Sequence, residues 1–252
     1  MSNSTNEYVQ KHLVLGGSLG IGLAFAVCKA EKGDHVKVIA RREEFLNAAQ
    51  KTLAQAGACS VEILSGDLLD SSFLSKLQKD GEHYDSIFIS GPSPCGGCLE
   101  KIHSLDNYSA IISDAYRTAI AYPLEIIQWA LGPGLRSGGS LYVVGSSASK
   151  KQILNTPFYL SAIFRRILDA LVDEYTPIFH RNEKKLKVWR PEVVLTPLSI
   201  NYACKQAKSE LVSNQKAKEI LEELFGLTEI PDSQKYVTDQ LALEEDKGAR
   251  SR

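Results

Sequence analysis

Residues 15–22 read LGGSLGIG and place four glycines and a serine just before an apolar, alanine-rich stretch. Glycines allow a tight turn and let the backbone approach a phosphate closely. A helix that starts there adds free N–H groups and a partial positive charge. We expect the phosphate contacts to come from Gly16, Ser18, Leu19, Gly20, Ile21 and Gly22. The alternative is a tight turn that only packs against neighbouring elements.

The type of nucleotide is indicated by the end of the next apolar stretch, VIARR (38–42). An acidic residue at this point would bind the adenosine ribose hydroxyls and repel a 2′-phosphate. This chain has Ala40 there, followed by Arg41 and Arg42, whose planar guanidinium groups suit a phosphate. The pattern favours NADP(H) over NAD(H). The alternative is that both arginines simply face solvent.

Strand-like and helix-like segments alternate along the whole chain. The expected strands are 12–16, 35–40, 59–67, 84–91, 139–147, 185–191 and 235–243. The expected helices are 20–32, 42–57, 70–80, 107–131, 158–175 and 199–224. Such alternation predicts right-handed βαβ crossovers and a parallel sheet. We therefore expect an α/β fold, a Rossmann-type doubly wound parallel sheet of about seven strands with helices on both faces.

Composition excludes several classes of protein. The chain has 252 residues without a linker or repeat, so we expect a single dinucleotide-binding domain over 1–252. The 29 Lys+Arg nearly balance the 30 Asp+Glu, which gives no reason to expect a nucleic-acid partner. No apolar run approaches the roughly 18 residues of a membrane span. The polar first ten residues carry no signal-peptide core, so the expected location is cytoplasmic.

Five cysteines without a secretion signal predict reduced thiols. Cys95 and Cys98 form a CxxC pair, but a zinc site would need a second such pair, so no metal is expected. A redox role for the pair is open beside the simpler interpretation as two thiols in a glycine-rich loop.

With these motifs the chain resembles the short-chain dehydrogenase/reductase family. The glycine turn is similar to the family's TGxxxGxG, with Leu15 for the Thr, and VVGSSAS (143–149) resembles the strand that delivers the catalytic serine. Thirteen residues after Ser146, at the family's spacing, stands Tyr159. PEVVLTPL (191–198) is similar to the family's PGxxxT, and 236–248 to its last strand.

The resemblance implies a role for further residues. Ser146 and Tyr159 fall at the catalytic positions, and Thr196 falls where the family contacts the nicotinamide amide. Asp67 and Leu68 match the residues that border the adenine. Ser90 and Gly91 stand in the loop after the fourth strand and are expected to bind the cofactor.

The chain also departs from the family. The lysine four residues after the tyrosine, which binds the nicotinamide ribose and lowers the phenol's pKa, is replaced by Ile163. None of the ten tyrosines has a lysine at that spacing. The family's helix asparagine falls near 118–120, where none of the residues is Asn. Arg166 lies too far along the helix, about 10 Å from Tyr159, to replace the lysine.

Other candidate proton donors are Cys95, Cys98, His103 and Glu192, of which Glu192 replaces the glycine of PGxxxT. The leading hypothesis is an NADP(H)-dependent oxidoreductase that acts on a small-molecule carbonyl or hydroxyl through a non-standard proton relay. The alternative is a dinucleotide-binding protein without redox turnover: a regulator, a scaffold, or a catalyst of isomerisation or dehydration. Family members associate through the two helices expected at 107–131 and 158–175, which implies a homodimer or homotetramer.

Overall fold

A computed structural model describes residues 8–91, 105–150, 159–207, 211–225 and 227–250. Its centre is a fully parallel sheet in the order β3-β2-β1-β4-β5-β6. The strands are β1 (Lys11–Leu15), β2 (His35–Ala40), β3 (Ser60–Ser65), β4 (Tyr84–Ile89), β5 (Leu135–Val144) and β6 (Lys185–Trp189). The sheet confirms the expected Rossmann-type α/β fold, with six strands instead of seven in the described part of the chain.

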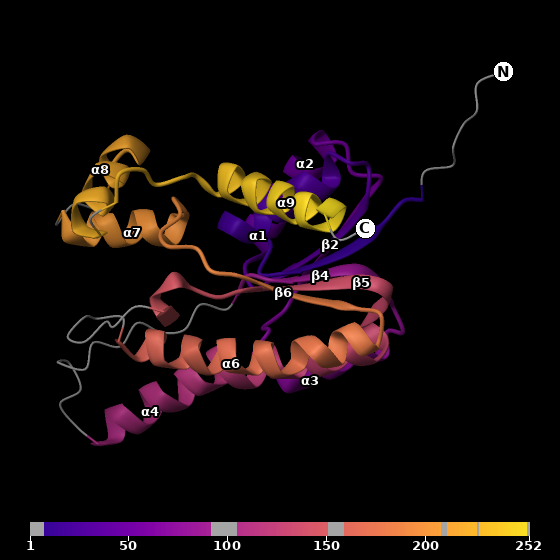
Figure 1. Cartoon of the computed structure of the whole chain (residues 1–252). Helices are drawn as coiled ribbons and strands as arrows, with labels where there is room; N and C mark the ends of the chain where they lie inside the picture. The colour runs from indigo at the N-terminus through magenta and orange to yellow at the C-terminus, as the bar shows by residue number, and fades with distance from the viewer. Residues whose placement is uncertain (1–7, 92–104, 151–158, 208–210, 226, 251–252) are drawn as a thin grey trace.

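Helices cover both faces of this sheet (Figure 1). One face carries α1 (Gly20–Ala30), α2 (Glu43–Gln55) and α9 (Ser233–Arg250). The other face carries α3 (Ser71–Lys79), α4 (Leu105–Tyr116), α5 (Tyr122–Trp129) and α6 (Tyr159–Arg181). A smaller apolar cluster joins α7 (Pro197–Gln206) to α8 (Asn214–Phe225).

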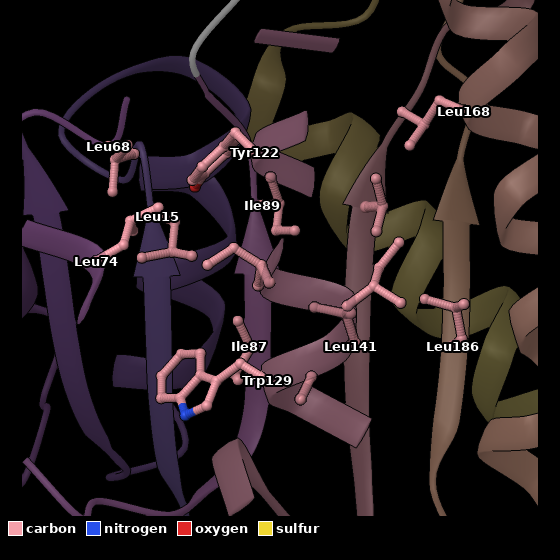
Figure 2. Close-up of a cluster of buried hydrophobic side chains, with 14 of the residues drawn as sticks. Leu15, Leu68, Leu74, Ile87, Ile89, Tyr122, Trp129, Leu141, Leu168 and Leu186 are labelled. Atoms are coloured by element: carbon pink, nitrogen blue, oxygen red, sulfur yellow. The ribbon is translucent and has the colours of Figure 1, made fainter. Parts of the chain in front are cut away.

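Alternation along the strands divides the apolar residues between two cores. Leu13 and Leu15 of β1 join the cluster under α3, α5 and α6, while Val14 between them joins the cluster under α1 and α9. Figure 2 shows part of the first cluster, where side chains of neighbouring strands meet Trp129 and Tyr122 of α5. Strands buried on both faces explain the nearly continuous apolar runs in the sequence.

The strand expected at 235–243 is wrong, because these residues belong to helix α9. Val237 is fully buried against the α1 side of the sheet, and Tyr236 and Leu241 pack beside it. The four-residue spacing of Val237 and Leu241 places these two apolar side chains on one helical face. Packing on α1 therefore decides the structure of a segment whose composition suits a strand.

Two expected helices are each divided. In place of one helix over 107–131, α4 continues through a wide π-helical turn (Arg117–Ala121) into α5. Pro123, which has no backbone N–H to donate, lies in the first turn of α5, directly after this irregular turn. In place of one helix over 199–224, α7 and α8 are separate. No described helix is long and apolar enough to cross a membrane.

Tyr122 offers a test of the core. Its side chain is buried, its hydroxyl has no hydrogen-bond partner among the described residues, and burial raises its pKa well above the usual value. Tyr122→Phe removes a desolvated, unpaired polar group, so we expect the free energy of unfolding in urea to rise by about 1 kcal/mol.

The matched control is Tyr84→Phe. Tyr84 is also a buried residue, but its hydroxyl donates a hydrogen bond to Glu82. This variant is expected to lose about 1–2 kcal/mol. Equal losses in both variants would contradict the assignment of Tyr122 as unpaired.

Candidate active site

The strand order places a topological switch point between β1 and β4, because the chain crosses back over β1 after β3. Ligands of open α/β sheets bind at the carboxyl ends of the strands at such a point. The glycine turn follows β1, and Ser90 and Gly91 follow β4. The backbone N–H groups of Ser90 and Gly91 both donate to the carbonyl of Leu15, at 2.9 and 3.3 Å. The two loops therefore meet at the switch point.

The glycine turn is a cradle that side chains would fill. Gly16 has φ +84°, and a Cβ there would lie 2.7 Å from the Gly91 nitrogen. A Cβ on Gly22 would lie 2.4 Å from the Gly16 carbonyl oxygen. The N-cap of α1 is Leu19, whose apolar side chain makes no capping hydrogen bond. The first N–H groups of α1 are thus left for an anion, so these residues fit a dinucleotide's pyrophosphate.

The residues expected around the adenosine half lie at the ends of β2 and β3. Arg41 and Arg42 are exposed directly after β2, and the Arg42 guanidinium stacks 4.0 Å from the ring centre of Phe45. Asp67 is exposed, and its carboxylate accepts the Leu69 N–H at 3.0 Å, which fixes the turn after β3. Leu68 is buried and packs in the core. This side of the edge therefore presents two cations to a phosphate.

Thr196 lies beside the start of α1. Its Cβ and Cγ2 atoms lie 3.4 Å from the point where a Cβ on Gly20 would stand. Its hydroxyl accepts the Ser199 N–H at 3.2 Å at the N-terminus of α7. The structure thus brings this residue, far away in the sequence, to the glycine turn. Glu192, which precedes it in the same segment, is exposed.

The loop after β5 carries Ser146 and is held by a polar network. The Ser149 hydroxyl lies 2.8 Å from the Ser146 carbonyl oxygen and 2.6 Å from Asp169 Oδ2. Arg190 Nε donates to the same Asp169 oxygen at 2.9 Å. Asp169 therefore ties the loop to α6 and to the end of β6. Sequence reasoning did not place this residue in the site, because its two partners, Ser149 and Arg190, lie on separate segments after β5 and β6.

Tyr159 is the first residue of α6, and its side chain lies outside the described part of the structure. Cys95, Cys98 and His103 also lie outside the described residues. The pairing of Ser146 with Tyr159 therefore stays a prediction. Four residues after Tyr159, Ile163 is partly buried on the same helix.

A small pocket opens at the carboxyl ends of β4 and β5, lined among others by Ser90, Gly91, Thr118, Val144 and Arg165. Thr118 belongs to the stretch 118–120, near which the resemblance places the family's asparagine, and its hydroxyl donates to the Asp114 carbonyl at 2.8 Å. Arg165 NH1 donates to the Val144 carbonyl at 2.7 Å. Sequence reasoning considered Arg166, which is exposed and donates to the Ser149 carbonyl at 2.8 Å. It missed Arg165, the residue that reaches the pocket.

A second cluster, of His12, Asp34 and Ser86, has the residue types of a hydrolytic triad but not its setting. His12 Nδ1 lies 2.6 Å from Ser86 Oγ, and Nε2 lies 2.9 Å from Asp34 Oδ2. All three are buried, and desolvation by burial lowers the pKa of His12. The cluster lies toward the amino ends of β1 and β4, away from the switch point, so it binds the sheet together and offers a substrate no access. The described residues contain no cluster of His, Cys, Asp and Glu that suits a metal ion.

Comparison with known proteins supports the fold assignment. No family model and no curated protein matches the sequence. Among solved structures, L-sorbose reductase from Gluconobacter frateurii, crystallised with NADPH and L-sorbose, has a TM-score of 0.76 at 16% identity, over 91% of this chain and 87% of that one.

Two further structures are similar over most of both chains. A short-chain dehydrogenase family protein from Francisella tularensis has a TM-score of 0.72 at 18% identity, over 93% and 90% of the two chains. An NADPH-dependent reductase of bacilysin biosynthesis has a TM-score of 0.78 at 14% identity, over 94% and 91%. The chain therefore has the fold that the resemblance to short-chain dehydrogenases implied.

Proposed function

We propose that this protein is an NADP(H)-dependent oxidoreductase acting on a carbonyl or hydroxyl group of a small molecule. The observation that carries the proposal is the cradle at the switch point, where Gly16 and Gly22 leave no room for a Cβ and the N-terminus of α1 is uncapped. The solved structures with this fold include reductases whose names state NADPH. The exposed pair Arg41 and Arg42 favours the 2′-phosphorylated cofactor.

The residues of the chain would divide the work between binding and proton transfer. The pyrophosphate would be held by the glycine turn, through Gly16, Ser18, Leu19, Gly20, Ile21 and Gly22. The rest of the cofactor would be contacted by Asp67, Leu68, Ser90, Gly91 and Thr196. NADPH, when bound, supplies the hydride that the carbonyl carbon receives. Ser146 and Tyr159 would donate hydrogen bonds to the carbonyl oxygen, which polarises the carbonyl and orients it.

The proton relay is the non-standard part of this proposal. With Ile163 in place of a lysine, no ammonium group one helical turn away lowers the pKa of Tyr159. An unassisted phenol is a weak acid at neutral pH. The same substitution favours the alternative function, a dinucleotide-binding protein without redox turnover. The retained Ser146–Tyr159 spacing favours the enzyme.

Two measurements separate these functions. NADPH is titrated into the protein while its fluorescence is followed, and oxidation of NADPH is then measured with a panel of aldehydes, ketones and 3-oxoacyl thioesters. Binding with turnover supports the oxidoreductase. Binding without turnover across the panel supports the regulator, scaffold or non-redox catalyst, and absence of binding contradicts both.

Tyr159→Phe measures how much the phenol contributes. Because no lysine lowers its pKa, we expect turnover to fall by about tenfold or less. Ser146→Ala serves as the comparison, since it removes the other hydrogen-bond donor. A loss of several orders of magnitude in Tyr159→Phe would mean that another group activates the phenol, and the role assigned to Ile163 would be wrong.

Assembly and location remain predictions within this proposal. A homodimer or homotetramer through α4, α5 and α6 is consistent with the exposure of Tyr116 on α4 (52%) and Ile167 on α6 (43%), two large side chains on neighbouring helices. A cytoplasmic location is the expectation from the sequence.

A further inference from the structure

The pocket at the ends of β4 and β5 is lined by a cation, Arg165, to which the proposed function assigns no role. Arg165 lies on α6, and Leu168 and Val172, on the same face of the helix, are buried in the core. Val144, whose carbonyl accepts from Arg165, is the last residue of β5. The guanidinium is therefore held at the carboxyl edge of the sheet, where it binds a residue two positions before Ser146.

The described residues use only part of the hydrogen-bonding capacity of this guanidinium. A guanidinium has five N–H groups, and Val144 is the one hydrogen-bond acceptor recorded for Arg165 among the described residues. The carboxylate of Asp169 attracts this guanidinium electrostatically but accepts hydrogen bonds from Ser149 and Arg190. Loss of hydration lowers the pKa of Arg165 to about 10, so it stays a cation at neutral pH. A desolvated cation with unused donors calls for an acceptor-rich ligand.

The position of the pocket identifies the ligand. Ser90 and Gly91 line the pocket and also contact the glycine turn, so the pocket continues from the cradle. A dinucleotide at a switch point places one half over β1 and β2 and the other half over the strands on the far side. The far side here is β4 and β5, where Arg165 lies. The second half of the molecule presents ribose hydroxyls and a carboxamide oxygen, all of which accept hydrogen bonds.

From this juxtaposition we infer that Arg165 binds the nicotinamide half of NADP(H), donating hydrogen bonds to its ribose or carboxamide oxygens. The inference rests on the proposed function, because it requires that a dinucleotide occupies the cradle. Arg165 would then bind the cofactor from a position six residues after Tyr159, with a guanidinium in place of the ammonium that the Tyr-x-x-x-Lys motif supplies four residues after its tyrosine.

The test compares a whole and a truncated ligand by isothermal titration calorimetry. NADPH contains both halves, whereas adenosine 2′,5′-bisphosphate contains only the adenosine half with its 2′-phosphate. Arg165→Met is expected to weaken NADPH by about 10- to 100-fold, the loss typical of a hydrogen bond to a charged group, and to leave the bisphosphate unchanged. Arg165→Lys is expected to recover part of the NADPH affinity.

The control is Arg181→Met, an exposed arginine at the end of the same helix, which removes one charge far from the pocket and should change neither affinity. Retained bisphosphate binding shows that Arg165→Met still folds. Equal weakening of both ligands, or unchanged NADPH binding, overturns the assignment of Arg165. If the unmodified protein binds neither ligand, the proposed function is itself wrong and the assignment falls with it.

Discussion

Arg41→Asp is expected to weaken NADPH binding by about 100-fold or more without a comparable loss for NADH. Arg41 directly follows β2, and its side chain is exposed. The preceding residue, Ala40, is not acidic, so no carboxylate at this point repels a 2′-phosphate. The substitution removes a charge-assisted hydrogen bond and places a carboxylate against the phosphate. A carboxylate at this point can instead accept from the free 2′-hydroxyl of NADH.

The measurement is the ratio of the NADPH and NADH dissociation constants in the same buffer and salt. Lys51→Asp is the matched control, because it makes the same change of charge at an exposed site on α2 away from the edge. Tighter binding of NADH than NADPH by the unmodified protein, or an equal loss of both cofactors in Arg41→Asp, would show that the arginines only face solvent.

Much of the binding edge follows from local sequence, because glycine turns and strand ends are local features. The strand at 35–40 is observed with the expected bounds, and α1 begins at the expected Gly20. Each of these depends on contiguous apolar residues and on glycines that permit positive φ, as at Gly16 and Gly20. The two ends of the cradle, at Gly16 and Gly91, could therefore be placed together from the topology alone.

What could not be predicted depends on contacts between distant segments. Helix α9 has the β-favouring residues Tyr236, Val237 and Thr238, and a resemblance to a terminal strand supported the wrong assignment. Its packing against α1 is not visible in the segment itself. Arg165 and Arg166 are adjacent in sequence, and only the rotation of α6 against the sheet decides which one enters the pocket.

The segment 181–187, RNEKKLK, shows the same difficulty in a charged stretch. Its many charged residues are typical of a solvated surface loop, but α6 extends to Arg181, β6 begins at Lys185, and Lys184 between them is buried. The buried lysine cannot be recognised within this charged segment, because the acceptors that allow an ammonium group to be buried lie elsewhere in the chain. Here the acceptors come from residues 130–132, more than fifty positions away.

Lys184→Met is expected to lower the free energy of unfolding by about 3 kcal/mol, the largest stability effect we expect from a single side chain outside the site. The Lys184 ammonium donates to the carbonyls of Ala130, Leu131 and Gly132, at 3.0, 2.8 and 2.5 Å. These carbonyls belong to the short π-helical segment Ala130–Gly134, whose backbone leaves the helical conformation at Gly132. The ammonium therefore supplies hydrogen bonds where the helical segment ends. A cation at a helix C-terminus also stabilises the helix dipole.

Methionine keeps the length and apolar stem of lysine, so the variant removes the ammonium group while the chain still fills its space. The three carbonyls, of which that of Ala130 is buried, then lose this donor, and the loop into β5 loses its contact with the segment after α6. Urea unfolding at neutral pH measures the loss, and Lys185→Met, an exposed lysine one residue further, is the control that should change little. Because Lys184 lies far from the switch point, NADPH affinity should be retained in the folded variant. A loss no larger than that of Lys185→Met would mean that water replaces the ammonium at these carbonyls.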